Sequence, residues 1–504
     1  MIRSKILATM GPAVADVDTL CQLFVAGVDV CRLNFSHGTL EGHGQMLSRI
    51  REASAKCQKH VAVLGDLSGP KIRLGQIDET TADHGLAVVP GDELIIQRDE
   101  ILGAGNRVST NYPRLVYDVN VGDRLLIEDG LLRFFCTGKT PDSIICQCKV
   151  GGVLKSRKGI NLPDTRINLP SITEFDWEAA NWAMNNQLDF LALSFVRNAA
   201  DLQQLKNHLT NCDSDIHLIA KIEKAEALAD IENIIAVADG LMIARGDLGV
   251  EMDVAKVPII QKDLIRRCRA SGKPVIVATQ MLQSMVESAS PTRAEVSDVA
   301  NAIYDGTDAV MLSGETSVGK FPVGCVHMMG HIAQVTEDYL INNPVDVERQ
   351  GHAILDLANY PLSGAIARGV RQIADDLRCK LVVVYSQTGE TARIFSKQRF
   401  PVPVVTLSTN DSVLRKLKLH YGLQPVNMAP PRDFLDLVQR VDQRLIKDGL
   451  VATGERIIVV AGSSMGMPGT MNGIVIHTVG QVEDLMGLEE AVKLNERKKN
   501  KAKA

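Results

Sequence analysis

Eight short apolar runs in the first 315 residues each end on polar residues that can take part in chemistry. Runs of Val, Ile and Leu separated by helix-like stretches are typical of parallel strands buried on both faces. Eight such units favour a closed (β/α)8 TIM barrel, in which functional side chains gather at the C-terminal strand ends. The runs occupy residues 5–11, 29–35, 61–66, 189–195, 217–223, 240–247, 274–280 and 309–315. The side chains expected at one mouth are those of Arg32, Asp66, Ser194, Lys221, Glu223, Arg245, Asp247, Thr279 and Glu315.

The third and fourth runs lie more than 120 residues apart, which indicates an insertion in the barrel. Residues 70–170 show short β-type runs broken by Pro-Gly, Gly-Asp and Asp-Gly turns. This pattern predicts a small inserted β-barrel domain, which would act as a lid over the mouth. The catalytic barrel would then comprise residues 1–69 and 171–343.

Helical and strand patterns alternate again after the barrel and predict an open C-terminal α/β domain over residues 344–485. Residues 486–504 are rich in Lys and Arg and lack apolar residues to bury, so we expect a basic, solvated tail. The strands of the C-terminal domain are expected within residues 380–386, 402–408, 456–462 and 473–479.

The composition excludes several classes of partner. A net charge of -5 over 504 residues gives no long-range attraction to nucleic acid or to an anionic membrane, so an anionic ligand needs a local cluster of cations. No stretch resembles a signal peptide or a membrane span. The ten cysteines match neither a zinc site nor a disulfide framework. We therefore expect a cytoplasmic protein with reduced thiols.

The fifth and sixth runs end on the most informative residues. Lys221 and Glu223 share one side of a strand, and Asp247 supplies a second carboxylate from the next strand. Two carboxylates beside cationic groups suit a magnesium ion that keeps waters or substrate oxygens in its other positions. Gly246 lacks a Cβ and would let an anion approach the main-chain N–H groups. The alternative is a purely structural Lys–Glu pair.

The second run ends on Arg32, Asn34 and Ser36, which alternate onto one face, and Asp66 arrives from the third run. A guanidinium beside carbonyl and hydroxyl oxygens suits one phosphoryl group and one small cation. The alternative for residues 34–38 is an ordinary turn.

Basic residues flank the insert at both hinges. Lys71 and Arg73 lie where the chain leaves the barrel, and Lys155, Arg157 and Lys158 lie where it returns. They could hold a polyphosphate when the lid closes, or they are ordinary surface charges.

Hydroxyl groups mark two further sites. Thr279, at the seventh ending, could relay a proton to a carbon acid through water, although a helix N-cap or a core threonine explains it as well. In the C-terminal domain, Ser386, Thr388, Gly389 and Thr391 join a strand to a helix and form a candidate phosphate seat, which Glu390 weakens. Helix capping alone would also explain these hydroxyls.

The motifs CRLNFSHG, IAKIE, ARGDLGVE, VIVATQMLQSM, SPTRAEVSDVANA and MLSGET occur in this order, and the chain resembles a pyruvate kinase over essentially its full length. The resemblance implies a barrel with a β lid, a C-terminal regulatory α/β domain and a homotetramer. It also implies the last step of glycolysis, the transfer of the phosphoryl group of phosphoenolpyruvate to ADP to give ATP and pyruvate.

The resemblance also implies roles for the substrate-side residues. Lys221 would neutralise the phosphoryl group in flight, and Arg32 would hold it from another side, because a loose transition state spreads charge over its equatorial oxygens. Glu223 and Asp247 would hold Mg2+ or Mn2+. The substrate carboxylate would meet the backbone of Gly246 and Asp247. The remaining implied contacts are substrate contacts from Ser194 and Thr279, enolate protonation with the help of Thr279, and nucleotide contacts from Arg73, Lys158, Asn34 and His37.

Two departures from the family pattern concern ions and effectors. Lys71 stands where potassium-requiring members carry Glu, and Leu67-Ser68 replaces Thr-Lys. The Lys71 ammonium could therefore replace the monovalent cation of a pocket formed by Asn34, Ser36, Asp66 and Leu67. The effector loop lacks the basic residue of the fructose-bisphosphate loop, and residues 462–472 offer no arginine. A monophosphate such as AMP or a sugar monophosphate is the expected effector.

Two other functions fit part of this pattern. One is another magnesium-dependent barrel enzyme acting on phosphoenolpyruvate or oxaloacetate, such as an enzyme of the citrate-lyase type, which has no need of a nucleotide-holding lid. The other is a catalytically silent paralogue that serves as a metabolite sensor or assembly partner.

Overall fold

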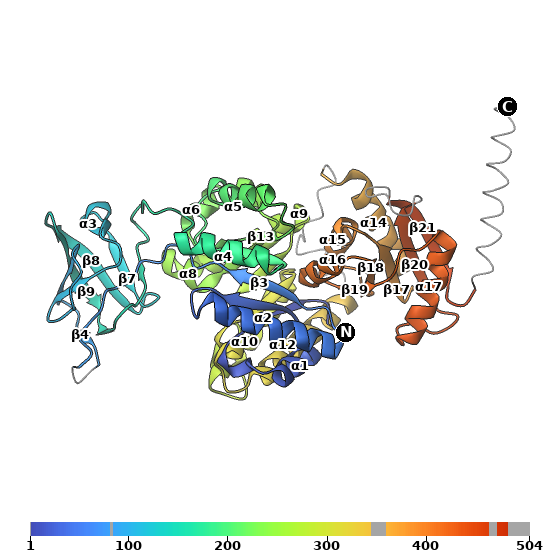
Figure 1. Ribbon diagram of the computed structural model, residues 1–504, viewed down its shortest axis with the longest axis horizontal. Helices are drawn as coiled ribbons and strands as arrows, with labels where there is room; N and C mark the ends of the chain where they lie inside the picture. The colour runs from blue at the N-terminus through green and yellow to red at the C-terminus, as the bar shows by residue number, and fades with distance from the viewer. Residues whose placement is uncertain (1, 81–83, 344–358, 463–470, 482–504) are drawn as a thin grey trace, which may run out of the picture.

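The computed structural model describes residues 2–80, 84–343, 359–462 and 471–481. Most of the polar linker before residue 361, residues 463–470 and the basic tail 486–504 lie outside this part of the chain. The inserted domain, the barrel and the C-terminal domain follow one another along the long axis of the molecule (Figure 1). Within the described residues, no helix combines the length and the hydropathy needed to cross a membrane.

All eight predicted runs form the strands of one closed parallel barrel, in the order β1-β16-β15-β14-β13-β12-β3-β2. The strands are β1 (Lys5–Thr9), β2 (Val28–Asn34), β3 (Ala62–Asp66), β12 (Phe190–Leu193), β13 (His217–Ile222), β14 (Gly240–Ala244), β15 (Val275–Ala278) and β16 (Ala309–Leu312). Their inward-facing side chains fill the barrel, and the outward-facing ones pack under the surrounding helices. The helices are α1 (Val17–Ala26), α2 (Leu40–Cys57), α4 (Glu174–Asn185), α5 (Ala199–Asn211), α6 (Ala225–Ala229), α7 (Ile231–Val237), α8 (Arg245–Glu251), α9 (Val257–Ala270), α10 (Arg293–Tyr304), α11 (Gly314–Ser317) and α12 (Pro322–Asn342).

The insert is all-β apart from one short helix, as its turn pattern indicates. Six of its strands form a sheet in the order β11-β7-β8-β9-β5-β6, and a separate pair forms the two-stranded sheet β10-β4. Residues 72–75 close the larger sheet into a small β-barrel, because Ile160 N of β11 donates to the Ile72 carbonyl oxygen and Gly75 N donates to the Ser109 carbonyl oxygen of β6, each at 2.8 Å. A core of its own, including the fully buried Phe134, holds the two sheets together. The elements are β4 (Leu86–Val88), β5 (Glu93–Gln97), β6 (Arg107–Ser109), α3 (Leu115–Asp118), β7 (Arg124–Ile127), β8 (Leu132–Lys139), β9 (Ser143–Val150), β10 (Gly152–Leu154) and β11 (Ile160–Asn161).

The C-terminal domain is an open α/β sheet in the order β19-β18-β17-β20-β21, with β21 antiparallel to β20. Four of its strands fall where the sequence predicts them. The fifth, β19, contains Pro425, which argues against a strand but is tolerated at a sheet edge. The elements are α14 (Pro361–Asp376), β17 (Leu381–Tyr385), α15 (Glu390–Lys397), β18 (Val404–Ser408), α16 (Asp411–Lys416), β19 (Leu423–Asn427), α17 (Phe434–Lys447), β20 (Arg456–Gly462) and β21 (Met471–Thr478).

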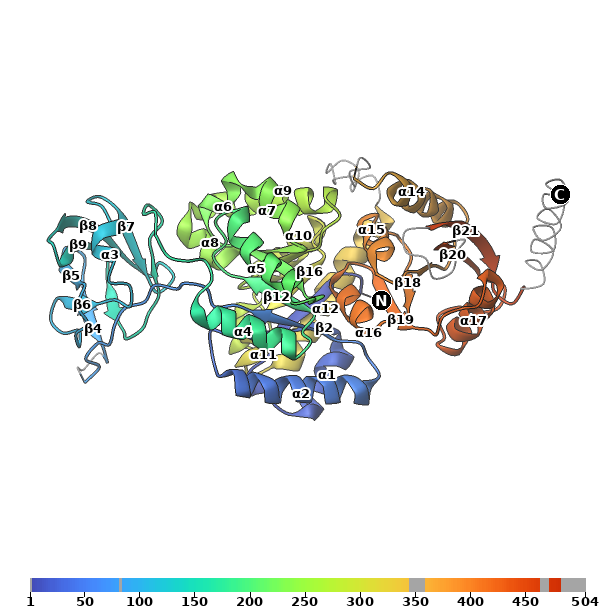
Figure 2. The ribbon, with the colours of Figure 1, turned by 45° about the horizontal axis from the view of Figure 1, so that its top comes forward.

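The C-terminal domain lies on the side of the barrel opposite the inserted domain (Figure 2). Ion pairs join it to the N-terminal ends of the barrel strands. Leu419, in the short helix η4 (Leu417–Leu419), enters the hydrophobic interior of the barrel. The pairs form between aspartates at or just before barrel strands and cations of the C-terminal domain. They are Lys397–Asp308 at 2.7 Å, Arg415–Asp189 at 2.8 Å, Lys416–Asp215 at 2.7 Å and Lys418–Asp29 at 3.2 Å. The interface between the two domains therefore combines apolar packing with ion pairs.

Candidate active site

Lys221 lies near the C-terminal end of β13, where its buried ammonium meets three oxygens. Nζ lies 2.9 Å from Glu223 Oε1 and 3.2 Å from Asp66 Oδ1, and it donates a hydrogen bond of 2.7 Å to Ser194 Oγ. Burial by itself lowers the pKa of Lys221, but the Asp66 and Glu223 carboxylates outweigh it, so the pKa is raised above its usual value. Lys221 is therefore a fixed, fully charged cation at the barrel mouth.

Asp66 connects Lys221 to Arg32. Arg32 donates from Nε to Asp66 Oδ2 at 2.7 Å, and its second terminal nitrogen lies 2.6 Å from the same oxygen. Burial raises the pKa of Asp66, but Lys221 and then Arg32 outweigh it and leave the pKa below its usual value. One ionised carboxylate thus holds two cations side by side, an arrangement suited to an anionic ligand.

Glu223 and Asp247 bring two carboxylates together from adjacent strand ends. Glu223 Oε2 accepts a hydrogen bond of 2.7 Å from Phe195 N, so its orientation is fixed. Burial, followed by the charge of Glu223, raises the pKa of Asp247 to about 6, although Lys71 and Lys221 oppose the shift. The pair therefore carries negative charge that the surrounding cations do not fully offset. This electrostatic situation suits a divalent cation.

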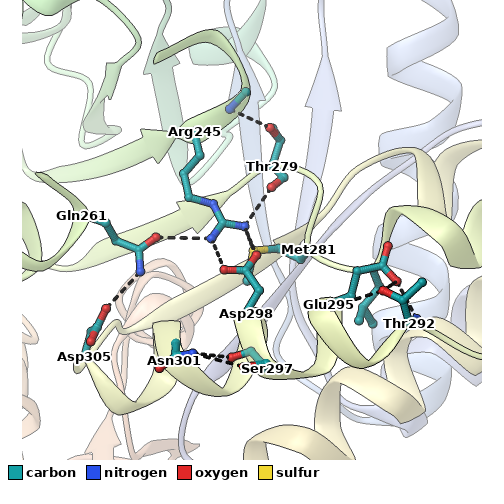
Figure 3. A network of polar contacts seen from close by, with 12 residues as sticks. Arg245, Gln261, Thr279, Met281, Thr292, Glu295, Ser297, Asp298, Asn301 and Asp305 are labelled. Carbon is teal, nitrogen blue, oxygen red and sulfur yellow. Dashed lines mark hydrogen bonds and ion pairs between the residues drawn. The ribbon is translucent and has the colours of Figure 1, made fainter. Parts of the chain in front are cut away.

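Thr279 and the start of α8 form one compact unit (Figure 3). Gly246 N donates to Thr279 Oγ1 at 3.3 Å, and a Cβ at position 246 would lie only 2.7 Å from that oxygen. Arg245 holds the same loop from behind, because it donates to the Thr279 carbonyl oxygen at 3.1 Å and forms a two-pronged pair of 2.6 Å contacts with Asp298. Gly246 is thus required by close packing at the place where the sequence predicts the approach of an anion.

The predicted nucleotide-binding cations lie on the lid side of the mouth. Arg73 and Gly159 form a bridge between the two hinge segments, and Arg73 donates to the Arg157 carbonyl oxygen at 3.2 Å. Lys158 Nζ lies 2.5 Å from Glu128 Oε1, and both side chains are about one-third exposed. Arg73 is also partly exposed, so solvent can reach both Arg73 and Lys158.

The other residues predicted for this side occupy the ends of β2 and β3. Asn34 and Asp66 are register partners on these neighbouring strands, and Asn34 Oδ1 accepts from Ser36 N at 3.2 Å. Ser36 and His37 are exposed in the turn after β2, whereas Leu67 is fully buried. The turn is therefore open to a ligand from the mouth.

Lys71 is half-buried, and its side chain passes over Gly159, where an added Cβ would lie 2.9 Å from Lys71 Cε. Within the described part of the chain, its ammonium forms no ion pair within 4 Å. Its charge acts on Asp247, where it opposes the rise in the pKa of that carboxyl. The positive charge of Lys71 is thus directed toward the paired carboxylates.

The predicted effector loop borders a cavity of about 730 Å³ between the C-terminal domain and the barrel. Thr388, Gly389 and Thr391 line it, whereas Ser386 is buried and does not. The cavity wall also contains cationic side chains that the loop sequence does not include, namely those of Lys273, Arg393 and Lys416. The cavity therefore combines hydroxyls, a helix N-terminus and positive charge with the carboxylates of Asp239 and Glu390.

Glu315 reaches the mouth end of its strand but serves a structural purpose. It is fully buried, and its carboxylate accepts hydrogen bonds from Leu282 N at 3.0 Å and Ser313 N at 2.7 Å. Arg245 is likewise committed to Asp298, a partner that strand-end reasoning misses because it lies on α10. Of the nine side chains expected at the mouth, these two stabilise loops.

Known protein families and relatives match this chain over most of its length. A family model for the barrel domain of pyruvate kinase matches residues 1–326, and one for the pyruvate kinase alpha/beta domain matches residues 364–477. The chain belongs to the pyruvate kinase family. The pyruvate kinase of Bacillus licheniformis is 40% identical over 96% of this chain and 81% of its own length, and that of Corynebacterium glutamicum is 39% identical over 95% of this chain and 98% of its own.

The similarity extends to three dimensions. A crystal structure of a pyruvate kinase from Cryptosporidium parvum matches with a TM-score of 0.85 and 33% identity, over 95% of this chain and 96% of that one. As a member of this family, the chain transfers the phosphoryl group of phosphoenolpyruvate to ADP and forms ATP and pyruvate. The alternative of an enzyme of the citrate-lyase type is wrong.

Proposed function

We propose that Lys221 and Arg32 together stabilise the negative charge of the phosphoryl group while it passes from phosphoenolpyruvate to ADP. The observation that supports this most strongly is the buried Lys221 ammonium, held within 3.2 Å of both Asp66 and Glu223. Fixed cations stabilise the charge that develops on the transferring group without any reorganisation during the reaction. Ser194, which contacts Lys221, would add a hydroxyl toward the substrate. Pyruvate formation that depends on ADP and on Mg2+, measured before and after substitution of Lys221, tests this assignment.

Glu223 and Asp247 are the proposed ligands of Mg2+ or Mn2+. Their mutual repulsion and burial, expressed in the raised pKa of Asp247, fit a site that a divalent ion completes. Within the described residues, no group of three or more His, Cys, Asp or Glu side chains is placed to hold a metal, so ligand or water oxygens would fill the other positions. The bound ion would supply charge neutralisation for phosphate and carboxylate oxygens.

Thr279 is the proposed hydroxyl for protonation of the enolate after the phosphoryl group has left. Its Oγ1 accepts from Gly246 N, so the hydroxyl hydrogen remains free to face the substrate side or a water. The N–H groups of Gly246 and Asp247 at the start of α8 would receive the substrate carboxylate. The rigid support from Arg245 and Asp298 suits a group that must be placed accurately.

Arg73 and Lys158 are the proposed contacts for the nucleotide phosphates, with Asn34 and His37 on the barrel side. We propose that the insert, residues 70–170, is a lid, that residues 1–69 and 171–343 form the catalytic barrel, and that residues 344–485 form a regulatory domain. A homotetramer and a cytoplasmic location are also proposed, the latter supported by the ten cysteines, all of which are free thiols.

We expect activity to be independent of potassium. The Lys71 ammonium lies close enough to Asp247 to oppose the rise in its pKa, and it would supply the positive charge of a monovalent cation. Replacement of potassium by tetramethylammonium should change the rate by no more than about twofold, because a tethered charge is not exchanged with the buffer.

Lys71→Glu should create a potassium requirement of about tenfold or more in rate, since a carboxylate would then need a cation of its own. Lys155→Glu, at an exposed lysine of the other hinge, is the matched control and should stay independent of potassium. A steep potassium requirement of the unmodified enzyme would refute the role of Lys71.

The effector is proposed to be a monophosphate, AMP or a sugar monophosphate, bound at the effector loop in the interdomain cavity. Thr388, Thr391 and the nearby Arg393 would hold one phosphate, whereas Glu390, 3.8 Å from Arg393, would repel a second. AMP or glucose 6-phosphate should lower the KM for phosphoenolpyruvate, and Thr388→Val should weaken that activation. Activation by micromolar fructose 1,6-bisphosphate would contradict the proposal.

A further inference from the structure

A buried carboxylate next to the active site connects the lid to the barrel. Glu251 Oε1 accepts a hydrogen bond of 2.6 Å from Lys224 Nζ and one of 3.1 Å from Asn161 Nδ2. The Glu251 side chain is 4% exposed, and Asn161 is 6% exposed. Two donors from different parts of the chain thus converge on one oxygen that water hardly reaches. Charge-assisted hydrogen bonds of this kind are stronger and more directional than neutral ones.

The three residues belong to segments that carry different parts of the proposed active site. Asn161 ends the lid strand β11, three residues after Lys158. Lys224 directly follows Glu223, and Glu251 is the last residue of α8, about one helical turn after Asp247. One carboxylate therefore ties the proposed nucleotide contact to both proposed metal ligands.

We propose that Glu251 is a positioning residue that fixes the lid strand carrying Lys158 relative to the Glu223 and Asp247 pair. This inference rests on the proposed roles of Lys158 and of the metal ligands. Transfer of a phosphoryl group needs donor and acceptor oxygens in line, and small misplacements of the acceptor lower the rate strongly. The acceptor is held partly by the lid, so the angle between lid and α8 must be fixed during transfer.

The other lid-to-barrel contacts would leave this angle less defined. Arg197 donates to the carbonyl oxygens of Ile167 and Leu169 at 3.1 Å each and to Ser171 Oγ at 2.6 Å, so it anchors the returning hinge but not β11. At the lid turn, an added Cβ on Gly130 would lie 3.8 Å from Val250 Cγ1, which is an ordinary apolar contact with little directional preference. Glu251 lies one residue from that contact and supplies the directional bond.

The decisive variant is Asn161→Ala, which removes the lid-side donor and leaves the Glu251–Lys224 pair intact. We expect kcat to fall about tenfold and the KM for ADP to rise, because loss of a hydrogen bond to a charged group lets the lid strand shift. The KM for phosphoenolpyruvate should stay within about twofold, since its proposed contacts lie on the barrel. Asn120→Ala, at an exposed lid asparagine, is the matched control and should behave like the unmodified enzyme.

Glu251→Gln and the double variant Asn161→Ala/Glu251→Gln complete a double-mutant cycle. The effects of two residues that act through one contact are not additive. We expect the double variant to be no slower than the slower single variant. The proposal would be overturned if the fold-losses in kcat of the two single variants multiplied in the double variant. It would also be overturned if the KM for phosphoenolpyruvate rose as much as that for ADP, or if Asn161→Ala left the kinetics unchanged. Asp247→Asn in the same assay separates the two claims. Retained activity there would refute the proposed metal site, whereas lost activity beside an unaffected Asn161→Ala would refute only the role of Glu251.

Discussion

Replacement of Lys221 by methionine should lower kcat at least about a hundredfold, because the loss of one fixed donor to a developing charge typically costs on the order of 3 kcal/mol or more. Methionine keeps much of the length and volume of the lysine stem but removes the ammonium that Asp66 and Glu223 hold at 3.2 and 2.9 Å. The rate of pyruvate formation from saturating phosphoenolpyruvate and ADP, with Mg2+ present, measures the effect.

Loss of Lys221 also leaves Asp66 and Glu223 without a shared cation, so folding must be measured beside activity. Arg32 still pairs with Asp66 in the variant, which limits the damage to one side of the cluster. Lys262→Met is a suitable control, because Lys262 forms an ion pair with Asp305 but is 51% exposed and lies on the outer helix α9. That variant should retain full activity, since exposed pairs contribute about 1 kcal/mol or less. A Lys221→Met enzyme that is folded and fully active would remove the proposed mechanism.

The barrel and its mouth could be predicted because both depend on a simple repeat. Parallel strands buried on both faces give long apolar runs, and the polar residue that ends each run must emerge at the same edge. Lys221, Glu223 and Asp66 therefore meet as predicted, although Asp66 is separated from Lys221 by more than 150 residues. The same argument places Glu315 at the mouth, but it cannot show that neighbouring backbone N–H groups occupy that carboxylate.

Contacts between side chains on different loops could not be predicted from strand periodicity. Asn161 and Glu251 are 90 residues apart, and neither belongs to a repeating pattern that names the other as its partner. Arg245 and Asp298 meet because α10 crosses behind the loop that holds Thr279, and a single sequence does not fix such helix positions. Hydrogen bonds of this kind depend on loop geometry, which the order of elements leaves open.

The interface between the barrel and the C-terminal domain also depends on contacts between residues that are far apart in the sequence. A substitution in this interface gives the second large effect that we expect. Replacement of Lys397 by methionine should lower the free energy of unfolding by about 3–5 kcal/mol, because removal of one partner of a buried pair leaves the other charge poorly compensated. Among the described residues, only the more distant Arg399, at 3.9 Å, would still form an ion pair with Asp308. Lys397 and Asp308 are both 0% exposed and lie 2.7 Å apart. Asp308 also accepts from Val275 N at 3.0 Å, so it cannot turn toward water in the variant. Thermal unfolding followed by calorimetry measures the loss.

A second substitution separates the buried charge from the lost packing. Lys397→Met combined with Asp308→Asn should recover part of the stability, since the buried group that has lost its nearest cation is then neutral. Lys418→Met removes a pair of the same interface in which the side chains are 21% and 14% exposed, and it should cost less because water can still reach Asp29. Equal losses for Lys397→Met and Lys418→Met would show that burial does not control the strength of this interface. A larger loss for Lys397→Met would make Asp308 the point at which the C-terminal domain is most firmly held to the barrel.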